Sequence, residues 1–146
     1  MKLFKTFSQK PAEVKREWYV VDASENNLGR VATVVAKLLA GKDKVTVTPH
    51  VDNGDFVIVI NAAKVGITGD KLEDKKYYRH SGYIGNMKTK SMKELMETNP
   101  ERVITEAVAG MLPKNKLQPA RLARLKVFTG ADHAHSAQTP KKVEVK

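Results

Sequence analysis

Residues 18–40 read WYVVDASENNLGRVATVVAKLLA, and residues 55–61 read DFVIVIN. The run Trp18–Asp22 is short, apolar and β-branched, which predicts a strand buried on both faces. Residues 28–40 repeat apolar side chains at helical spacing, and the following Gly41 is typical of a left-handed helix end. Residues 55–61 predict a second buried strand. A strand, a helix and a strand in this order indicate a right-handed βαβ unit and a parallel sheet.

The rest of the chain predicts shorter elements. The side-chain oxygen of Asn26 or Asn27 is expected to cap the first helix. Asn99 as the cap and Pro100 as the first residue begin a stronger helix, which Pro113 ends. The pattern also predicts a strand at 65–68, a helix at 91–96 and an edge strand at 126–129. A further helix is expected to start at Gln118-Pro119. There is no internal repeat and no second core, so we predict a single α/β domain.

Charge is unevenly distributed along the 146 residues. Lys and Arg number 26 against 16 Asp and Glu, and this net charge of +10 favours a polyanionic partner such as nucleic acid. The net charges are +4, −2, +5, −3 and +6 for residues 1–16, 17–70, 71–93, 94–112 and 113–146. We therefore divide the chain into a basic N-terminal arm (1–16), an α/β RNA-binding domain (17–130) and a polar, basic C-terminal tail (131–146).

Composition also excludes several classes of protein. The chain has no cysteine, so it has neither disulfides nor a thiolate metal site. The N-terminal arm lacks the apolar run of a signal peptide, and no stretch is long enough to span a bilayer. We expect a soluble, cytoplasmic protein without membrane contact. The C-terminal tail is poor in apolar residues and is expected to become ordered only on a partner.

Residues 71–93, KLEDKKYYRHSGYIGNMKTKSMK, carry the strongest functional signal. Cationic groups that can pair with phosphates alternate here with aromatic rings that can stack on unpaired bases. The alternative is a solvated loop or hairpin whose tyrosines pack on the core. We favour RNA contact, and the candidate residues are Lys71, Lys75, Lys76, Tyr77, Tyr78, Arg79, His80, Tyr83, Lys88 and Lys90.

Two polar clusters could instead indicate catalysis or metal binding. His50, Asp52 and Asp55 lie in TPHVDNGD at 48–55, and they are the basis of an alternative function as a small α/β enzyme or nucleotide-binding module. A tight loop whose Asp and Asn side chains bond backbone N–H groups is favoured, since no nucleophile partner is evident. Residues 132–135, DHAH, could bind a metal, but RNA contact by a polar tail is favoured. We therefore predict no catalytic residue, no metal site and no cofactor.

Several stretches, in this order, resemble the bacterial large-subunit ribosomal protein L-thirteen family. The matching pieces are KPAEVKREWYVVDA at 10–23, LGRVAT at 28–33, TPHVDNGD at 48–55, VINA at 59–62, KKYYRHSGY at 75–83, PERV at 100–103, GMLP at 110–113, LKVFTG at 125–130 and DHAH at 132–135. The chain departs from the family at Asn115 and Gln118, where relatives usually have glycine, and at Ile84, where many have proline.

The resemblance implies a three-layer α/β/α fold around a mostly parallel four-stranded sheet. It also implies a structural role in the large ribosomal subunit, with large-subunit ribosomal RNA and neighbouring ribosomal proteins as partners, and a part in early subunit assembly. The family's arginine-bearing C-terminal part faces RNA, which adds Arg121 and Arg124 to the candidates, together with Lys114 and Lys116 just before them. Messenger RNA is left open as a further partner.

Overall fold

The computed structural model describes residues 6–145, so residues 1–5 of the predicted basic arm and Lys146 lie outside the described residues. The main sheet has the strand order β5-β2-β1-β6, and all three strand pairs are parallel. Its strands are β1 (Trp18–Asp22), β2 (Phe56–Ile60), β5 (Leu125–Val127) and β6 (Lys141–Val143). A second, antiparallel sheet consists of β3 (Lys76–His80) and β4 (Met87–Ser91). The α/β class and the four-stranded parallel sheet are thus confirmed.

Five α-helices and three 3-10 helices complete the described part of the chain. The α-helices are α1 (Leu28–Ala40), α2 (Lys71–Asp74), α3 (Met92–Thr98), α4 (Pro100–Met111) and α5 (Gln118–Ala123). The 3-10 helices are η1 (Pro11–Glu13), η2 (Ala62–Lys64) and η3 (Ser136–Gln138). Within the described residues, every helix is too short or too polar to cross a membrane.

The predicted strand–helix–strand unit is present. β1 and β2 are parallel neighbours, and α1 connects them with its apolar stripe, including Val31, Val35 and Leu39, fully buried. Gly41 ends α1 in the left-handed conformation, with φ of 72°. The expected cap was wrong: the Asn27 side chain accepts no helix N–H, and the first amide, of Leu28, donates to the carbonyl of Gly66 at 2.8 Å.

The same contact explains why the expected strand at 65–68 does not form. This stretch makes only a single parallel bridge, between Asn27 and Gly66, because the carbonyl of Gly66 accepts the first amide of α1. The predicted cap of the stronger helix is confirmed, since the Asn99 side chain accepts the amide of Arg102 at the start of α4. Ser91 caps α3 in the same way by accepting the amide of Glu94.

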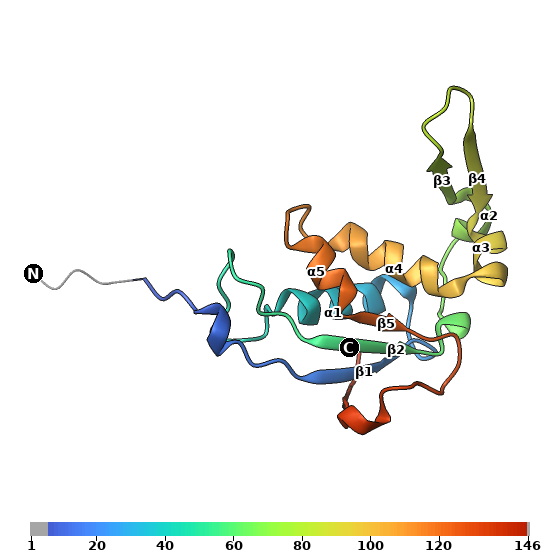
Figure 1. The fold of residues 1–146 in the computed structure, drawn as a ribbon. Helices are drawn as coiled ribbons and strands as arrows, with labels where there is room; N and C mark the ends of the chain where they lie inside the picture. Colours follow the sequence, from blue (N-terminus) through green and yellow to red (C-terminus); the bar gives the residue numbers. More distant parts are fainter. Residues whose placement is uncertain (1–5, 146) are drawn as a thin grey trace, which may run out of the picture.

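The two faces of the main sheet are covered in different ways. Strand residues such as Val21, Val57 and Val59 pack against α1 and α4, and Figure 1 shows the α-helices on this side. Alternate strand residues point to the opposite face. There the stacked rings of Trp18 and Phe56, 4.3 Å apart between centroids, are covered by the C-terminal segment with η3. That segment, and not a set of α-helices, makes the third layer.

The C-terminal tail differs most from its prediction. Residues 141–143 form the edge strand β6 beside β1, although 131–146 was expected to become ordered only on a partner. His135 lies 5.1 Å from Trp18 and 5.9 Å from Phe128 between ring centroids. Aromatic contacts and backbone pairing supply the stabilisation that the low apolar content of the tail did not indicate.

The loop before β2 packs against the end of α1 so tightly that Gly54 has no room for a side chain. A Cβ atom at this position would lie 1.8 Å from the carbonyl oxygen of Leu39. By contrast, a Cβ at Gly29, in the first turn of α1, would meet nothing within 4 Å. The close approach at Gly54 fixes the loop that carries Asp52, which matters for the site below.

We expect Gly54→Ala to lower the free energy of unfolding by roughly 1–3 kcal/mol or more, because the backbone of α1 or of the loop must shift. The matched substitution Gly29→Ala should raise it by about 0.5–1 kcal/mol, because alanine loses less backbone entropy in a helix. Denaturant titrations of both variants measure these values. A Gly54→Ala protein as stable as the parent would contradict the packing described here.

Candidate nucleic-acid interface

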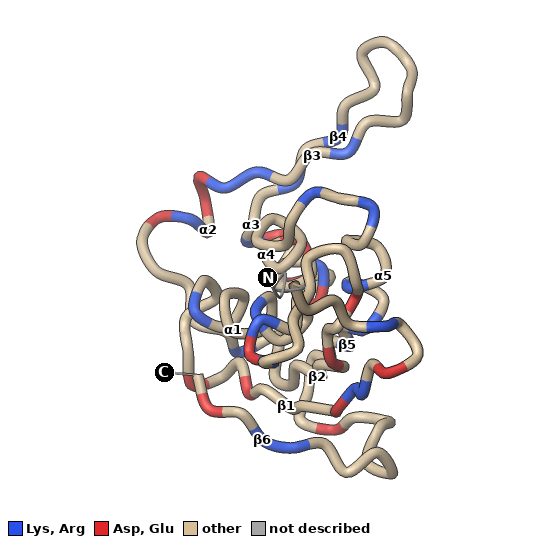
Figure 2. Tube along the Cα trace, turned by 90° about the vertical axis from the view of Figure 1, so that its left-hand side faces the viewer, with Lys and Arg blue, Asp and Glu red and all other residues tan. Residues whose placement is uncertain are grey.

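The basic segment 71–93 forms a helical turn and a hairpin that projects from the domain. β3 and β4 pair antiparallel, with Arg79 opposite Lys88, and Figure 1 shows them extending beyond the helical side of the sheet. Gly82 and Gly85, at φ of 96° and 75°, form the turn with the left-handed conformations that glycine tolerates. The amide of Gly82 donates to Nδ1 of His80 at 2.9 Å. Figure 2 shows the lysines and arginines along the stem.

The two faces of this hairpin have different compositions. Opposed residues of an antiparallel pair project to the same face, and successive residues alternate. The register therefore places Tyr77, Arg79, Lys88 and Lys90 on one face. The other face carries Lys76, Tyr78, His80, Met87 and Thr89. The period-two pattern of charge was present in the sequence, but it could be assigned to faces only after the register was known.

The structure separates the three candidate tyrosines. Tyr77 is only 7% exposed and packs with Met92, Leu95 and Val103, so its ring is not free to stack on RNA bases as predicted. Burial raises the pKa of its hydroxyl. Tyr78 and Tyr83 are 59% and 77% exposed and remain available to a partner. The hairpin alternative for this segment is therefore correct for Tyr77, which anchors the stem to α3 and α4.

The exposed lysine candidates lie near the two ends of α4. Lys71 and Lys75 belong to the stretch leading into the hairpin, and the Nζ atom of Lys75 lies 5.2 Å from the ring centroid of Tyr77. Lys114 and Lys116 are exposed in the loop between α4 and α5. Figure 1 shows this loop and the hairpin at opposite ends of α4, both on the helical side of the sheet. A ligand that contacts both must be extended.

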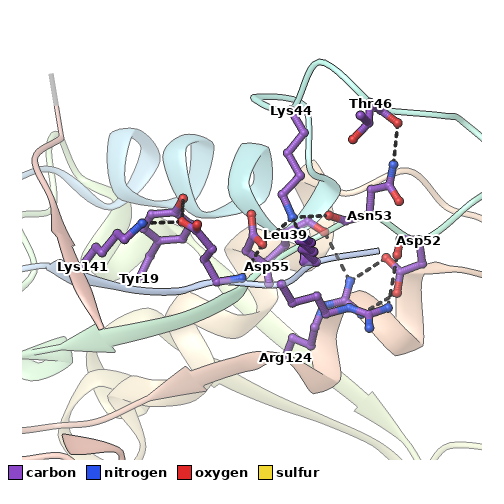
Figure 3. A network of polar contacts seen from close by, with 12 residues as sticks. Tyr19, Leu39, Lys44, Thr46, Asp52, Asn53, Asp55, Arg124 and Lys141 are labelled. Carbon is purple, nitrogen blue, oxygen red and sulfur yellow. Dashed lines mark hydrogen bonds and ion pairs between the residues drawn. The ribbon is translucent and has the colours of Figure 1, made fainter. Parts of the chain in front are cut away.

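The two candidate arginines near the C-terminus, predicted to face RNA, are buried and paired within the fold. The side chains of Arg121 and Arg124 are 6% and 8% exposed. Both nitrogens of the Arg124 fork bind the Asp52 carboxylate, with Nη2 at 2.6 Å from Oδ1 (Figure 3). Nε of Arg121 lies 3.7 Å from the same oxygen. These arginines hold the loop before β2 against α5.

The proposed enzymatic triad does not form a reactive cluster. Asp55 accepts hydrogen bonds from Nζ of Lys44 at 2.5 Å and from the amide of Glu17 at 2.9 Å, as expected for a structural loop. His50 is exposed, with Nε2 at 3.2 Å from Oγ of Ser8. Within residues 6–145, no three His, Cys, Asp or Glu side chains are placed to hold a metal. The tight-loop interpretation of 48–55 is confirmed for Asp55, which accepts a backbone N–H, whereas Asp52 binds Arg124 and the Asn53 side chain donates to the carbonyl of Thr46.

Asp52 is kept ionised by its partners. Burial pushes its pKa upward, but the hydrogen bonds from Arg124 and the positive charges of Arg124, Arg121 and Arg16 outweigh burial, so the pKa lies below its ordinary value. A carboxylate with depressed pKa stabilises the fold above its unfolded-state pKa. This stabilisation is lost as the pH falls through the folded-state pKa.

Sequence reasoning missed one cation at the hairpin. Arg102, in the first turns of α4, lines the same hollow as Arg79, Lys88 and Lys90. It belongs to the acidic stretch 94–112, and its helical spacing gave no sign of a binding role. Only the packing of α4 beside the hairpin brings it there.

The two neighbouring tyrosines should respond differently to truncation. Tyr77→Ala should lower the free energy of unfolding by roughly 3–5 kcal/mol, the range for removing a large buried aromatic side chain. Tyr78→Ala, the matched control on the opposite face, should change it by less than about 0.5 kcal/mol. Thermal melts with known unfolding enthalpy report both. Equal losses would mean that the register of β3 is not the one described.

Asp52→Asn should destabilise the domain by roughly 3–5 kcal/mol at neutral pH, because it leaves two buried guanidinium groups without their anion. This difference in stability should shrink below about pH 4. There the Asp52 carboxylate of the parent becomes protonated, first in the unfolded and then in the folded state, so the parent also loses the stabilisation. Asp132→Asn, at an exposed position, serves as the control. Denaturant titrations from pH 7 to pH 2 measure the difference, and a pH-independent difference would contradict this account.

Known proteins resemble this chain over nearly its whole length. Residues 16–134 match the family model described as Ribosomal protein L13. The "Large ribosomal subunit protein uL13" of Methylococcus capsulatus is 56% identical over 141 residues, which covers 97% of this chain and 99% of that protein. The proteins of the same name from Neisseria gonorrhoeae and Kocuria rhizophila are 56% and 54% identical, covering 97% and 96% of this chain and 99% and 95% of those proteins. The chain therefore belongs to the ribosomal protein L13 family.

Proposed function

We propose that this protein is a structural component of the large ribosomal subunit that binds large-subunit ribosomal RNA and supports early subunit assembly. The observation that carries the RNA contact is the projecting hairpin of β3 and β4. The lysines and the arginine of its stem are exposed, and they lie outside the core of the main sheet. Neighbouring ribosomal proteins would be its protein partners.

The energetics of the hairpin cations favour an external polyanion. Arg79 and Lys88 face each other directly across the hairpin, an arrangement that costs stability in the absence of a counter-charge. No carboxylate among residues 6–145 lies within ion-pair distance of Arg79, Lys88 or Lys90. RNA phosphates would supply that charge and release condensed counterions on binding.

The surface candidates divide into two classes of contact. Lys71, Lys75, Lys114 and Lys116 would bind phosphates at the two ends of α4. Tyr78, with His80 beside it in the strand, and Tyr83 at the tip would stack on unpaired bases, because aromatic planes bind bases in single-stranded RNA. We withdraw Tyr77, Arg121 and Arg124 from the interface because they are buried.

Two alternatives are not carried forward. The family is one of ribosomal proteins and not of enzymes, and Asp52 and Asp55 are held by Arg124 and Lys44 in structural contacts, so the enzyme alternative is rejected. Nothing in the fold or in the names of the relatives supports messenger RNA as a partner.

The variant Lys76→Ala, Arg79→Ala, Lys88→Ala should fold like the parent, because exposed charges contribute little to stability. Its affinity for large-subunit ribosomal RNA should fall, and the slope of log affinity against log salt should decrease by up to about 0.7–0.9 for each phosphate that the variant no longer binds. A thermal melt and an RNA titration at several salt concentrations measure both quantities.

The control removes three exposed lysines outside the hairpin, Lys42, Lys64 and Lys142. It has the same net charge as the first variant and should bind RNA more tightly than that variant does. If the hairpin variant binds with parental affinity and slope, or if the two variants are equally weakened, the hairpin is not the RNA-binding element.

A further inference from the structure

The hairpin and the helices behind it border a small cavity that is open to solvent and has a cationic lining. Its volume is about 150 Å³, and it is lined by Tyr77, Arg79, Lys88, Lys90, Leu95 and Arg102. A water molecule takes roughly 30 Å³ in the liquid, so the space suits a group of several heavy atoms. Four of the six lining residues carry a positive charge, and none carries a negative charge. The composition fits a compact anion.

Three different elements bring these cations together. Arg79 comes from β3, Lys88 and Lys90 from β4, and Arg102 from the first turns of α4. On β3 and β4, the side chains concerned all project from the face that Tyr77 turns toward the core. The buried ring of Tyr77 therefore fixes the position of that face against α3 and α4. The packing of the stem thus determines where these cationic side chains lie.

The positive charge of the cavity is only partly neutralised within the described chain. Arg102 pairs with Glu106, with Nε at 2.6 Å from Oε1, and both side chains are more than a third exposed. The other three cations have no ion pair among residues 6–145. The hydroxyl of Tyr77, at the wall of the cavity, is also buried without a hydrogen-bond partner in the same part of the chain. A bound anion would relieve the repulsion among the cations.

We propose that this cavity binds a single phosphate group of the RNA backbone, held by Arg79, Lys88, Lys90 and Arg102. The proposal rests on the proposed function and deepens it: the cavity face of the hairpin takes phosphate, while the opposite face, with Tyr78, takes bases. The planar forks of the two arginines suit the paired oxygens of a phosphate, and the two lysines add point charges. RNA bound in this way has a fixed register on the hairpin.

The test compares two lysines on opposite faces of one hairpin. Nuclear magnetic resonance titrations of the full-length chain use inorganic phosphate and, separately, a short oligouridylate, both at constant ionic strength. In the parent, both probes should give saturable shifts of the amides of Arg79, Lys88, Lys90 and Arg102. Lys90→Ala should weaken the binding of both probes by about tenfold or more, as is typical when a charged hydrogen bond is removed. Lys76→Ala, with the same charge change on the other face and outside the cavity lining, should weaken the binding of inorganic phosphate by less than about threefold.

A third variant gives an effect of opposite sign. Glu106→Gln frees Arg102 from its carboxylate and should tighten phosphate binding by about two- to fivefold, as expected when a weak exposed ion pair no longer competes. Thermal melts of each variant check that the hairpin remains folded, and Arg102→Gln replaces Lys90→Ala if that variant melts early.

Several results would overturn the phosphate site. Among them are shifts that do not saturate, equal weakening of inorganic phosphate binding by Lys90→Ala and Lys76→Ala, and binding of inorganic phosphate without binding of the oligouridylate. In each of these cases the full chain could still bind ribosomal RNA, and the proposed function would stand. Conversely, saturable phosphate binding by a chain that does not bind ribosomal RNA would overturn the proposed function and, with it, the assignment of the cavity to an RNA phosphate.

Discussion

Two neighbouring strands that run in the same direction cannot be joined by a tight turn, so the chain must cross over one face of the sheet between them. Here β1 and β2 form such a pair and α1 makes the crossing. Because all strand pairs of the main sheet are parallel, both of its faces have to be covered. α1 and α4 cover one face, and the C-terminal segment covers the other through contacts such as that of His135 with Trp18. The loop between α1 and β2 is then held beside α5, where Asp52 meets its two arginines.

Burial separates the positive charges of this protein into two groups with opposite roles. Arg121 and Arg124 are withdrawn from solvent and bound to Asp52, so their charge serves the fold. The lysines and arginine of the β3–β4 stem are exposed and without carboxylate partners among the described residues, so their charge remains available to a ligand. A charge count along the sequence treats both groups alike. Only the burial of each side chain distinguishes a structural arginine from one that can bind phosphate.

The base of the hairpin is anchored to the domain, while the rest of the hairpin is exposed. This arrangement holds its positively charged side chains at a defined position. Tyr77 packs with Met92, Leu95 and Val103, so the base of the stem belongs to a small hydrophobic cluster of its own. Beyond that cluster the hairpin has no core to contribute to, and its side chains are exposed. A ligand bound along the stem would thus meet side chains whose backbone is already positioned, and it would lose less affinity to the ordering of the protein.

The amino-acid sequence by itself determined the strand–helix–strand unit, the limits of α1 with the left-handed Gly41, the start of α4 at Asn99 and Pro100, and the basic character of the hairpin. These features depend on periodicity and on residues a few positions apart, which a sequence displays directly. The tertiary structure alone decided that Arg124 is paired with Asp52, 72 residues away, that Tyr77 is core while Tyr78 is surface, and that residues 141–143 complete the sheet. It also brought Arg102 to the hairpin. In each of these cases the partner is distant in the chain, and burial or pairing depends on how separate elements pack, which local pattern does not encode.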